Sequence, residues 1–128
     1  MQQGSIDKKN NKQKGNKGEE LAVEYLIKKG YHIHRRNYIS GKNEIDIVAQ
    51  DKNTMVFVEV KERSTDYFGE PYKAVDFKKQ QYIIKVADDY IRRYNIDLES
   101  RFDVISITIP PMGEAKIEHI IDAFTPQF

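Results

Sequence analysis

The sequence predicts an α/β domain in which helices flank a mixed β-sheet, with the elements in the order α-β-β-β-α-β-β. Two segments, 16–29 and 76–94, place their apolar residues at helical spacing. Short runs rich in Ile, Val, Phe and Tyr are bounded by Gly, Pro, Asn or Asp, which is typical of strands. The strands on either side of the second helix can lie parallel, joined by a right-handed crossover through that helix.

The first half of the chain is expected to hold one helix and three strands. The helix over 16–29 has one apolar face, and Gly30 is a natural stop after its last turn. The strands expected after it cover 31–37, 44–50 and 54–62. A turn over 40–43 joins the first two strands, and Asp51-Lys52-Asn53 indicates a hairpin between the second and third.

The second half is expected to hold the long helix and two more strands. A polar loop over 63–72 leads to the helix over 76–94, which Asp76 can cap. The strands expected after it cover 101–109 and 115–121. The chain has 128 residues, of which 39% are hydrophobic and 32% charged, so we expect one domain with a modest core.

Cysteine usage and hydropathy exclude several classes of protein. The chain has no cysteine, so neither a disulfide framework nor a thiolate metal site can form, and a cytoplasmic location is expected. No apolar run approaches the roughly 18 residues that a membrane-spanning helix needs. The N-terminus also lacks the apolar core of a signal peptide.

Charge is distributed unevenly along the chain. Residues 1–17 hold five lysines and one aspartate, whereas the remainder has 16 basic and 19 acidic side chains. We therefore expect a flexible basic arm over 1–15, followed by the folded domain over 16–128. The arm is either a solubilising tail or a segment that contacts nucleic-acid phosphates.

Three charged residues interrupt otherwise apolar strands. Strand interiors disfavour Asp, Glu and Lys, yet Asp46, Glu59 and Lys61 lie within Ile- and Val-rich runs. Because side chains alternate along a strand, Glu59 and Lys61 should share one face, and Asp46 should point opposite to Ile45 and Ile47. Two carboxylates suit Mg²⁺ or Mn²⁺, which can polarise a phosphate, and a nearby lysine can stabilise the charge that develops. A structural alternative is a solvated sheet face with a cross-strand ion pair.

Several short segments, spread over nearly the whole chain after the arm, match a known pattern. They are Gly18-Glu19 with Ala22 and Tyr25-Leu26, Gly30-Tyr31, Arg36-Asn37, Glu44-Ile45-Asp46, Phe57-Val58-Glu59-Val60-Lys61 with Arg63, Phe68-Gly69 with Pro71, Lys79, and Arg101-Phe102-Asp103-Val104. Together they resemble the PD-(D/E)xK nuclease superfamily, and more closely the YraN-like family of bacterial proteins, which is related to archaeal Holliday-junction resolvases. The resemblance implies a restriction-endonuclease-like fold and a metal-dependent nuclease site.

The resemblance also implies roles for individual residues. Asp46 and Glu59 would bind the metal, and Lys61 would be the catalytic lysine. Glu19 would match the acidic residue that the resolvases carry on their first helix; it lies beside the apolar stripe, whereas Glu20 points away from it. A favourable charge at the helix N-terminus is the alternative explanation for Glu19. One departure from the family pattern is Asn43, which stands where a glycine is usual.

Other candidates rest on weaker observations. Lys79, Arg63 and Arg101 could contact phosphates, or they could be solvated or paired with acids. His32 and His34 alternate on a strand, but no third metal ligand is apparent, so exposed histidines are expected. The loop aromatics Tyr67, Phe68 and Tyr72 could stack on an unpaired base, although packing against the core is the more ordinary role.

The resemblance implies a metal-dependent endonuclease acting on DNA, in particular branched or structured DNA, with Mg²⁺ or Mn²⁺ as cofactor. A homodimer is implied by analogy, because a junction presents two symmetric cuts. One alternative is a non-catalytic nucleic-acid-binding or adaptor protein that retains the nuclease fold. Another is an interaction module whose basic arm recruits a partner.

The metal site makes a geometric prediction about strand register. Asp46 and Glu59 can share a metal only if both side chains leave the sheet on the same face, as they would if Asp46 stood opposite Glu59 in the hairpin. The numbers of paired residues must then sum to 105, and the turn must contain an even number of residues unless a bulge intervenes. Lys61 should lie one pleat further on the same face, and Glu19 should approach from the first helix.

Overall fold

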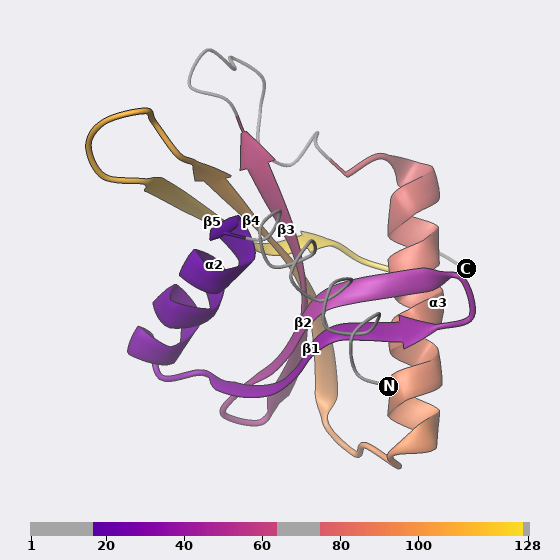
Figure 1. Cartoon of the computed structure of the whole chain (residues 1–128). Coiled ribbons are helices and arrows are strands. Elements are labelled where there is room, and N and C mark those ends of the chain that lie inside the picture. The colour runs from indigo at the N-terminus through magenta and orange to yellow at the C-terminus, as the bar shows by residue number, and fades with distance from the viewer. Residues whose placement is uncertain (1–16, 64–74, 127–128) are drawn as a thin grey trace, which may run out of the picture.

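The computed structural model describes residues 17–63 and 75–126. Its elements are α2 (Lys17–Lys28), β1 (His32–Ser40), β2 (Asn43–Asp51), β3 (Thr54–Arg63), α3 (Phe77–Arg93), β4 (Glu99–Thr108) and β5 (Lys116–Phe124) (Figure 1). The arm predicted over 1–15 lies outside the described residues. No helix within the described segments is both long and apolar enough to cross a membrane.

The five strands form one mixed sheet in the order β1-β2-β3-β4-β5. Strands β1, β2 and β3 form an antiparallel meander, and β5 pairs antiparallel with β4. Strands β3 and β4, which flank α3 in the sequence, run parallel. The predicted fold class and element order are therefore confirmed.

Two strands extend further than their sequence patterns indicate. β1 was expected to end at Asn37 but continues to Ser40, because its last residue pairs with Asn43 across a two-residue turn in which Gly41 has a φ of 63°. β5 continues past residue 121 to Phe124, which pairs with Phe102 beyond an irregularity in the ladder. Both extensions depend on a partner strand rather than on local alternation.

The sheet separates two apolar clusters, one beneath each helix (Figure 1). The cluster on the α3 side contains Phe57, Tyr90 and Phe102. The cluster on the α2 side contains Leu26 and Val58. The neighbours Phe57 and Val58 of β3 therefore face opposite helices, as regular strand alternation requires.

Strand β2 does not alternate regularly, contrary to the expectation that Ile45 and Ile47 share one face. Ile45 packs in the cluster under α3, whereas Ile47 packs in the cluster under α2. The pairing of β2 with β1 keeps one register across this stretch, so the strand twists about its axis at Asp46 without an inserted residue. Opposite this twist, Asn37 of β1 has a φ of 53°, a left-handed conformation that is uncommon outside glycine.

Candidate active site

The hairpin between β2 and β3 sets the position of the two candidate carboxylates. Its paired residues are Asp51↔Thr54, Gln50↔Met55, Ala49↔Val56, Val48↔Phe57 and Ile47↔Val58. The turn is the two-residue segment Lys52-Asn53, with a φ of 57° at Lys52. The predicted even-numbered turn and register are thus confirmed, and the next residues along the two strands are Asp46 and Glu59.

Beyond this hairpin, a side chain replaces a backbone carbonyl as the hydrogen-bond acceptor for β3. The last backbone pair is Ile47↔Val58, and one step further the N–H of Val60 donates to Oδ2 of Asp46 at 2.8 Å. Because β2 twists at Asp46, its carboxyl lies between β2 and β3 instead of on one face of the sheet, so the prediction that both carboxylates leave the sheet on the same face is not borne out. The two strands therefore separate at Asp46, and the carboxyl group occupies the resulting gap.

The carboxyl groups of Asp46 and Glu59 lie side by side, and each alters the pKa of the other. Burial, followed by repulsion from Glu59, raises the pKa of Asp46 to about 7. Burial likewise raises the pKa of Glu59, although the nearby Lys79 and Lys61 oppose the increase. Two adjacent carboxylates resist being charged together, so the pair favours a state in which one of them is protonated.

Two lysines stand next to Glu59. Lys61 follows it on the same face of β3, and its positive charge favours the ionised form of Glu59. Lys79, in the first turn of α3, places Nζ 3.7 Å from Oε2 of Glu59. The Lys79 side chain is 45% exposed and that of Glu59 only 7% exposed, so the lysine is the mobile partner of this ion pair.

Glu19 approaches the pair from α2, as predicted. Its Oε1 accepts a hydrogen bond from Nδ2 of Asn37 at 3.0 Å, and the same Nδ2 donates to Oε2 of Glu44 at 2.8 Å. Oε2 of Glu19 is buried and has no hydrogen-bond partner among the described residues, although Nε of Arg36 lies 3.6 Å away. Burial raises the pKa of Glu19, the Asn37 bond opposes this, and the negative charge of Asp46 adds to the rise.

The donor set fits a hard divalent cation but is incomplete as a cage. Within residues 17–63 and 75–126, no group of three or more His, Asp or Glu side chains is arranged to hold a metal ion. Asp46 and Glu59 supply two oxygen donors, and the unbonded Oε2 of Glu19 is a third oxygen that lies nearby. Mg²⁺ commonly binds through one or two carboxylates and keeps several waters, so this set suits it.

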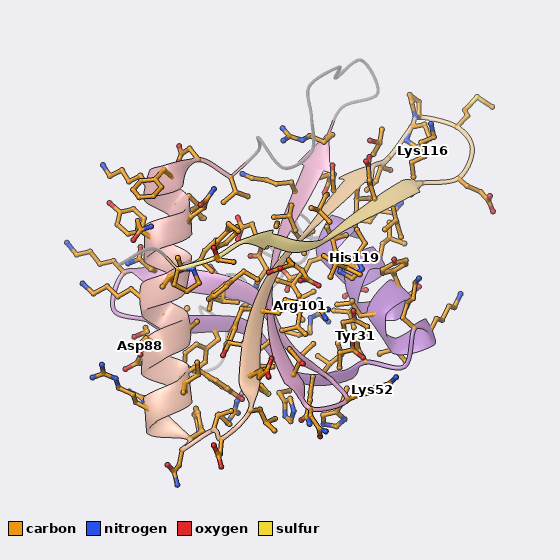
Figure 2. The ribbon with its side chains drawn as sticks, turned by 180° about the vertical axis from the view of Figure 1, so that it is seen from behind. Tyr31, Lys52, Asp88, Arg101, Lys116 and His119 are labelled. Carbon is orange, nitrogen blue, oxygen red and sulfur yellow. The ribbon has the colours of Figure 1, made fainter. Side chains whose placement is uncertain are left out.

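The other candidate residues are placed less favourably for this site. Arg63 ends β3 and is half-buried. The guanidinium of Arg101 is bonded to Asp103 and Tyr31 on the α2 side of the sheet, so the alternative of pairing with an acid holds for Arg101 (Figure 2). His32 and His34 are exposed, as expected. The aromatic residues at 67, 68 and 72 lie outside the described residues.

A buried polar cluster beneath α2 was not anticipated from the sequence. Asp103 is fully buried and accepts hydrogen bonds from Arg101 at 2.9 Å and from His119 at 2.7 Å. Burial alone would raise the pKa of Asp103, but the bonds from His119 and Arg101 lower it below its ordinary value. Figure 2 shows Arg101, Tyr31 and His119 gathered beside α2. The position of Asp103 within the apolar run of β4 is the feature of the sequence that could have indicated this cluster.

Sequence comparisons place this chain among related bacterial proteins. The model of the uncharacterised protein family UPF0102 matches residues 18–107. A UPF0102 protein of Phocaeicola vulgatus is 46% identical over 115 residues, covering 88% of this chain and 92% of the relative. One from Caldanaerobacter subterraneus is 45% identical over 122 residues, covering 93% of this chain and all of the relative. The matched region includes every described residue of the candidate site.

Proposed function

Because the chain belongs to the uncharacterised protein family UPF0102, we propose a function from the chemistry of its site: a metal-dependent endonuclease of the PD-(D/E)xK type that acts on DNA, in particular branched or structured DNA. The cofactor would be Mg²⁺ or Mn²⁺. The observation that carries the proposal is the position of the Asp46 carboxyl, held by the N–H of Val60 where β2 and β3 separate, next to Glu59 and with Lys61 on the same face as Glu59.

This arrangement is unusual for a purely structural role. A protein that needs only stability gains little from placing the half-buried Asp46 next to the buried Glu59, because at least one of the two carboxyls must hold a proton or lose free energy. The backbone bond from Val60 fixes Asp46, and the burial of Glu59 limits its rotamers. Pre-positioned acidic groups of this kind are typical of sites that bind a cation.

Each residue then has a distinct task. Asp46 and Glu59 would hold the cation, and Glu19 would contribute directly or through a water. The cation would polarise the scissile phosphate and make water more acidic. Lys61, held beside Glu59 by strand alternation, would orient the attacking water and stabilise negative charge that grows on the phosphate oxygens. Asn37 would hold Glu19 and Glu44 in place by donating to both from the same amide nitrogen.

Exposed cations beside the site support a polyanionic substrate. Arg36 pairs with Glu19 and Lys79 pairs with Glu59, and the side chains of the two cations are 40% and 45% exposed. Cations around an acidic centre can bind backbone phosphates on both sides of the one that is cut.

A non-catalytic nucleic-acid-binding protein is the second candidate. One observation favours it: the described residues contain no assembled group of three metal-binding side chains, and Lys79 already compensates the charge of Glu59. Such a protein would bind DNA with the same affinity whether or not a divalent cation is present. The endonuclease would bind the cation and cut.

The deciding experiment is incubation of the protein with branched, single-stranded and linear duplex DNA in the presence of Mg²⁺ or Mn²⁺. Cleavage that the Asp46→Asn variant lacks is the expected result. The matched control is Asp88→Asn, an exposed aspartate on the outer face of α3 that pairs with Arg92. Wild-type protein that binds DNA but leaves every form intact would favour the binding protein.

A further inference from the structure

Lys79 is held in position by the cap of its own helix. Asp76 is the N-cap of α3, and its Oδ1 accepts a hydrogen bond from the backbone N–H of Lys79 at 2.8 Å. Gln80 adds a second anchor by donating from its side chain to the carbonyl of Val75 at 3.0 Å. The backbone at Lys79 is therefore fixed, and only its long side chain can move.

The Lys79 ammonium group lies beside a cluster of acidic side chains. Glu59 is in contact with Asp46 and is flanked along its own strand by Lys61. Glu44 and Glu19 add further negative charge around Asp46. The Lys79 ammonium lies 3.7 Å from Oε2 of Glu59, and its charge opposes the rise in the pKa of Glu59. Oε2 of Glu59 is therefore already engaged in an ion pair.

We propose that the ammonium of Lys79 neutralises Glu59 in the metal-free protein. It is displaced when the divalent cation binds and then pairs with a phosphate of the nucleic acid. This inference rests on the proposed function and specifies how the same site is regulated. A cation at Glu59 repels the ammonium, and the half-exposed Lys79 side chain can move away while the buried Glu59 cannot.

The displacement links two binding events. When DNA binds, its phosphates draw Lys79 away from Glu59, which frees Oε2 and strengthens the binding of the metal. By thermodynamic reciprocity, the metal strengthens the binding of DNA by the same factor. The metal-free protein would therefore keep Glu59 in an internal ion pair, and binding of nucleic acid would make the site bind the metal more tightly.

The test measures the affinity of the full chain for Mn²⁺ alone by calorimetric titration, without DNA. The variants are Lys79→Met, which keeps the aliphatic stem but removes the charge, and Lys79→Arg, which keeps the charge. Lys78→Met is the matched control, because it removes the same charge from the adjacent, exposed position of α3. Circular dichroism checks that each variant is folded.

We expect Lys79→Met to bind Mn²⁺ about fivefold more tightly than the wild type, as loss of a partly exposed ion pair implies. Lys79→Arg and Lys78→Met should bind it as the wild type does. Equal Mn²⁺ affinities of the wild type and Lys79→Met would overturn the role of Lys79. An equal gain in affinity in Lys78→Met would overturn it too. Neither result would contradict the metal site itself. Absence of Mn²⁺ binding in every protein would overturn both this inference and the proposed function.

Discussion

The backbone N–H of Val60 donates to Oδ2 of Asp46 at 2.8 Å, so a carboxyl group of β2 completes the hydrogen bonding of β3 where the two strands separate. The same carboxyl lies next to Glu59, whose charge raises its pKa. Under the proposed function, Asp46 would have a structural role toward Val60 and a chemical role toward a cation. The two roles can be separated by substitution.

Asp46→Asn is expected to abolish cleavage and leave the fold intact. The amide oxygen of Asn can still accept from Val60, but a neutral ligand beside Glu59 should lower the cleavage rate by about a hundredfold or more. Asp46→Ala also removes the acceptor and should lower the free energy of unfolding by about 1 kcal/mol relative to Asp46→Asn. Cleavage rates and denaturant unfolding check this. Equal stability of the two variants would contradict a structural role for the Val60 bond.

The stability of the metal-free protein should depend on pH through Asp46. Its pKa in the fold, about 7, lies above the ordinary value of 3.8, so the folded chain holds a proton that the unfolded chain has released. That contribution to stability is full below the ordinary pKa and is lost as the pH rises through about 7. We expect the melting temperature to fall over this range, and Asp46→Asn to reduce the fall.

Mn²⁺ should counteract this loss. Because the metal would compete with the proton bound to Asp46, it should raise the melting temperature more at about pH 8 than at about pH 6. Thermal unfolding with and without Mn²⁺ at both pH values provides the measurement, with Ca²⁺ as a second cation. An increase that is the same at both pH values would mean that the metal binds elsewhere.

Asp103 should show the opposite dependence on pH. Its pKa is lowered by the bonds from His119 and Arg101, so its ion pairs contribute stability above the ordinary value of 3.8. This contribution is lost as the pH falls through the lowered pKa. Asp103→Asn should lower the free energy of unfolding at neutral pH by about 3 kcal/mol, because Arg101 and His119 lose a buried anion. Acid unfolding that is unchanged in this variant would count against the assignment.

Asn37 combines a backbone requirement with a side-chain requirement. Its φ of 53° suits glycine, and its amide group donates to both Glu19 and Glu44. Asn37→Gly should lose only the amide, whereas Asn37→Ala should also be strained and should be less stable by about 1 kcal/mol more. Denaturant unfolding of both variants checks this order. A more stable alanine variant would show that the backbone relaxes freely.

Much of the fold could be predicted from local patterns in the sequence. The helical spacing in 76–94 and the alternation around Phe57 each depend on one element packing against one face. The two-residue turn Lys52-Asn53 also fixed which residue stands opposite Glu59, because register follows from turn length. Local patterns of this kind carry the element order and the closeness of the two candidate carboxylates.

The details of the site could not be predicted in the same way. Alternation assumes a regular strand, and β2 twists at Asp46 so that Ile45 and Ile47 face opposite clusters. The contact of Asn37 with Glu19 and Glu44 depends on where α2 packs against the sheet, which no single segment encodes. The ion pair of Lys79 with Glu59 likewise requires the helix to dock.

The meander of β1, β2 and β3 is joined by two-residue turns, whereas the parallel pair of β3 and β4 is closed only through α3. Short connections lose less chain entropy on closure, so the meander should form early in folding and the crossover late. Asp46 and Glu59 would then meet before Lys79 arrives to compensate their charge. Substitutions in the β2–β3 turn should mainly slow folding, and substitutions in the first turn of α3 should mainly speed unfolding, which stopped-flow kinetics can measure.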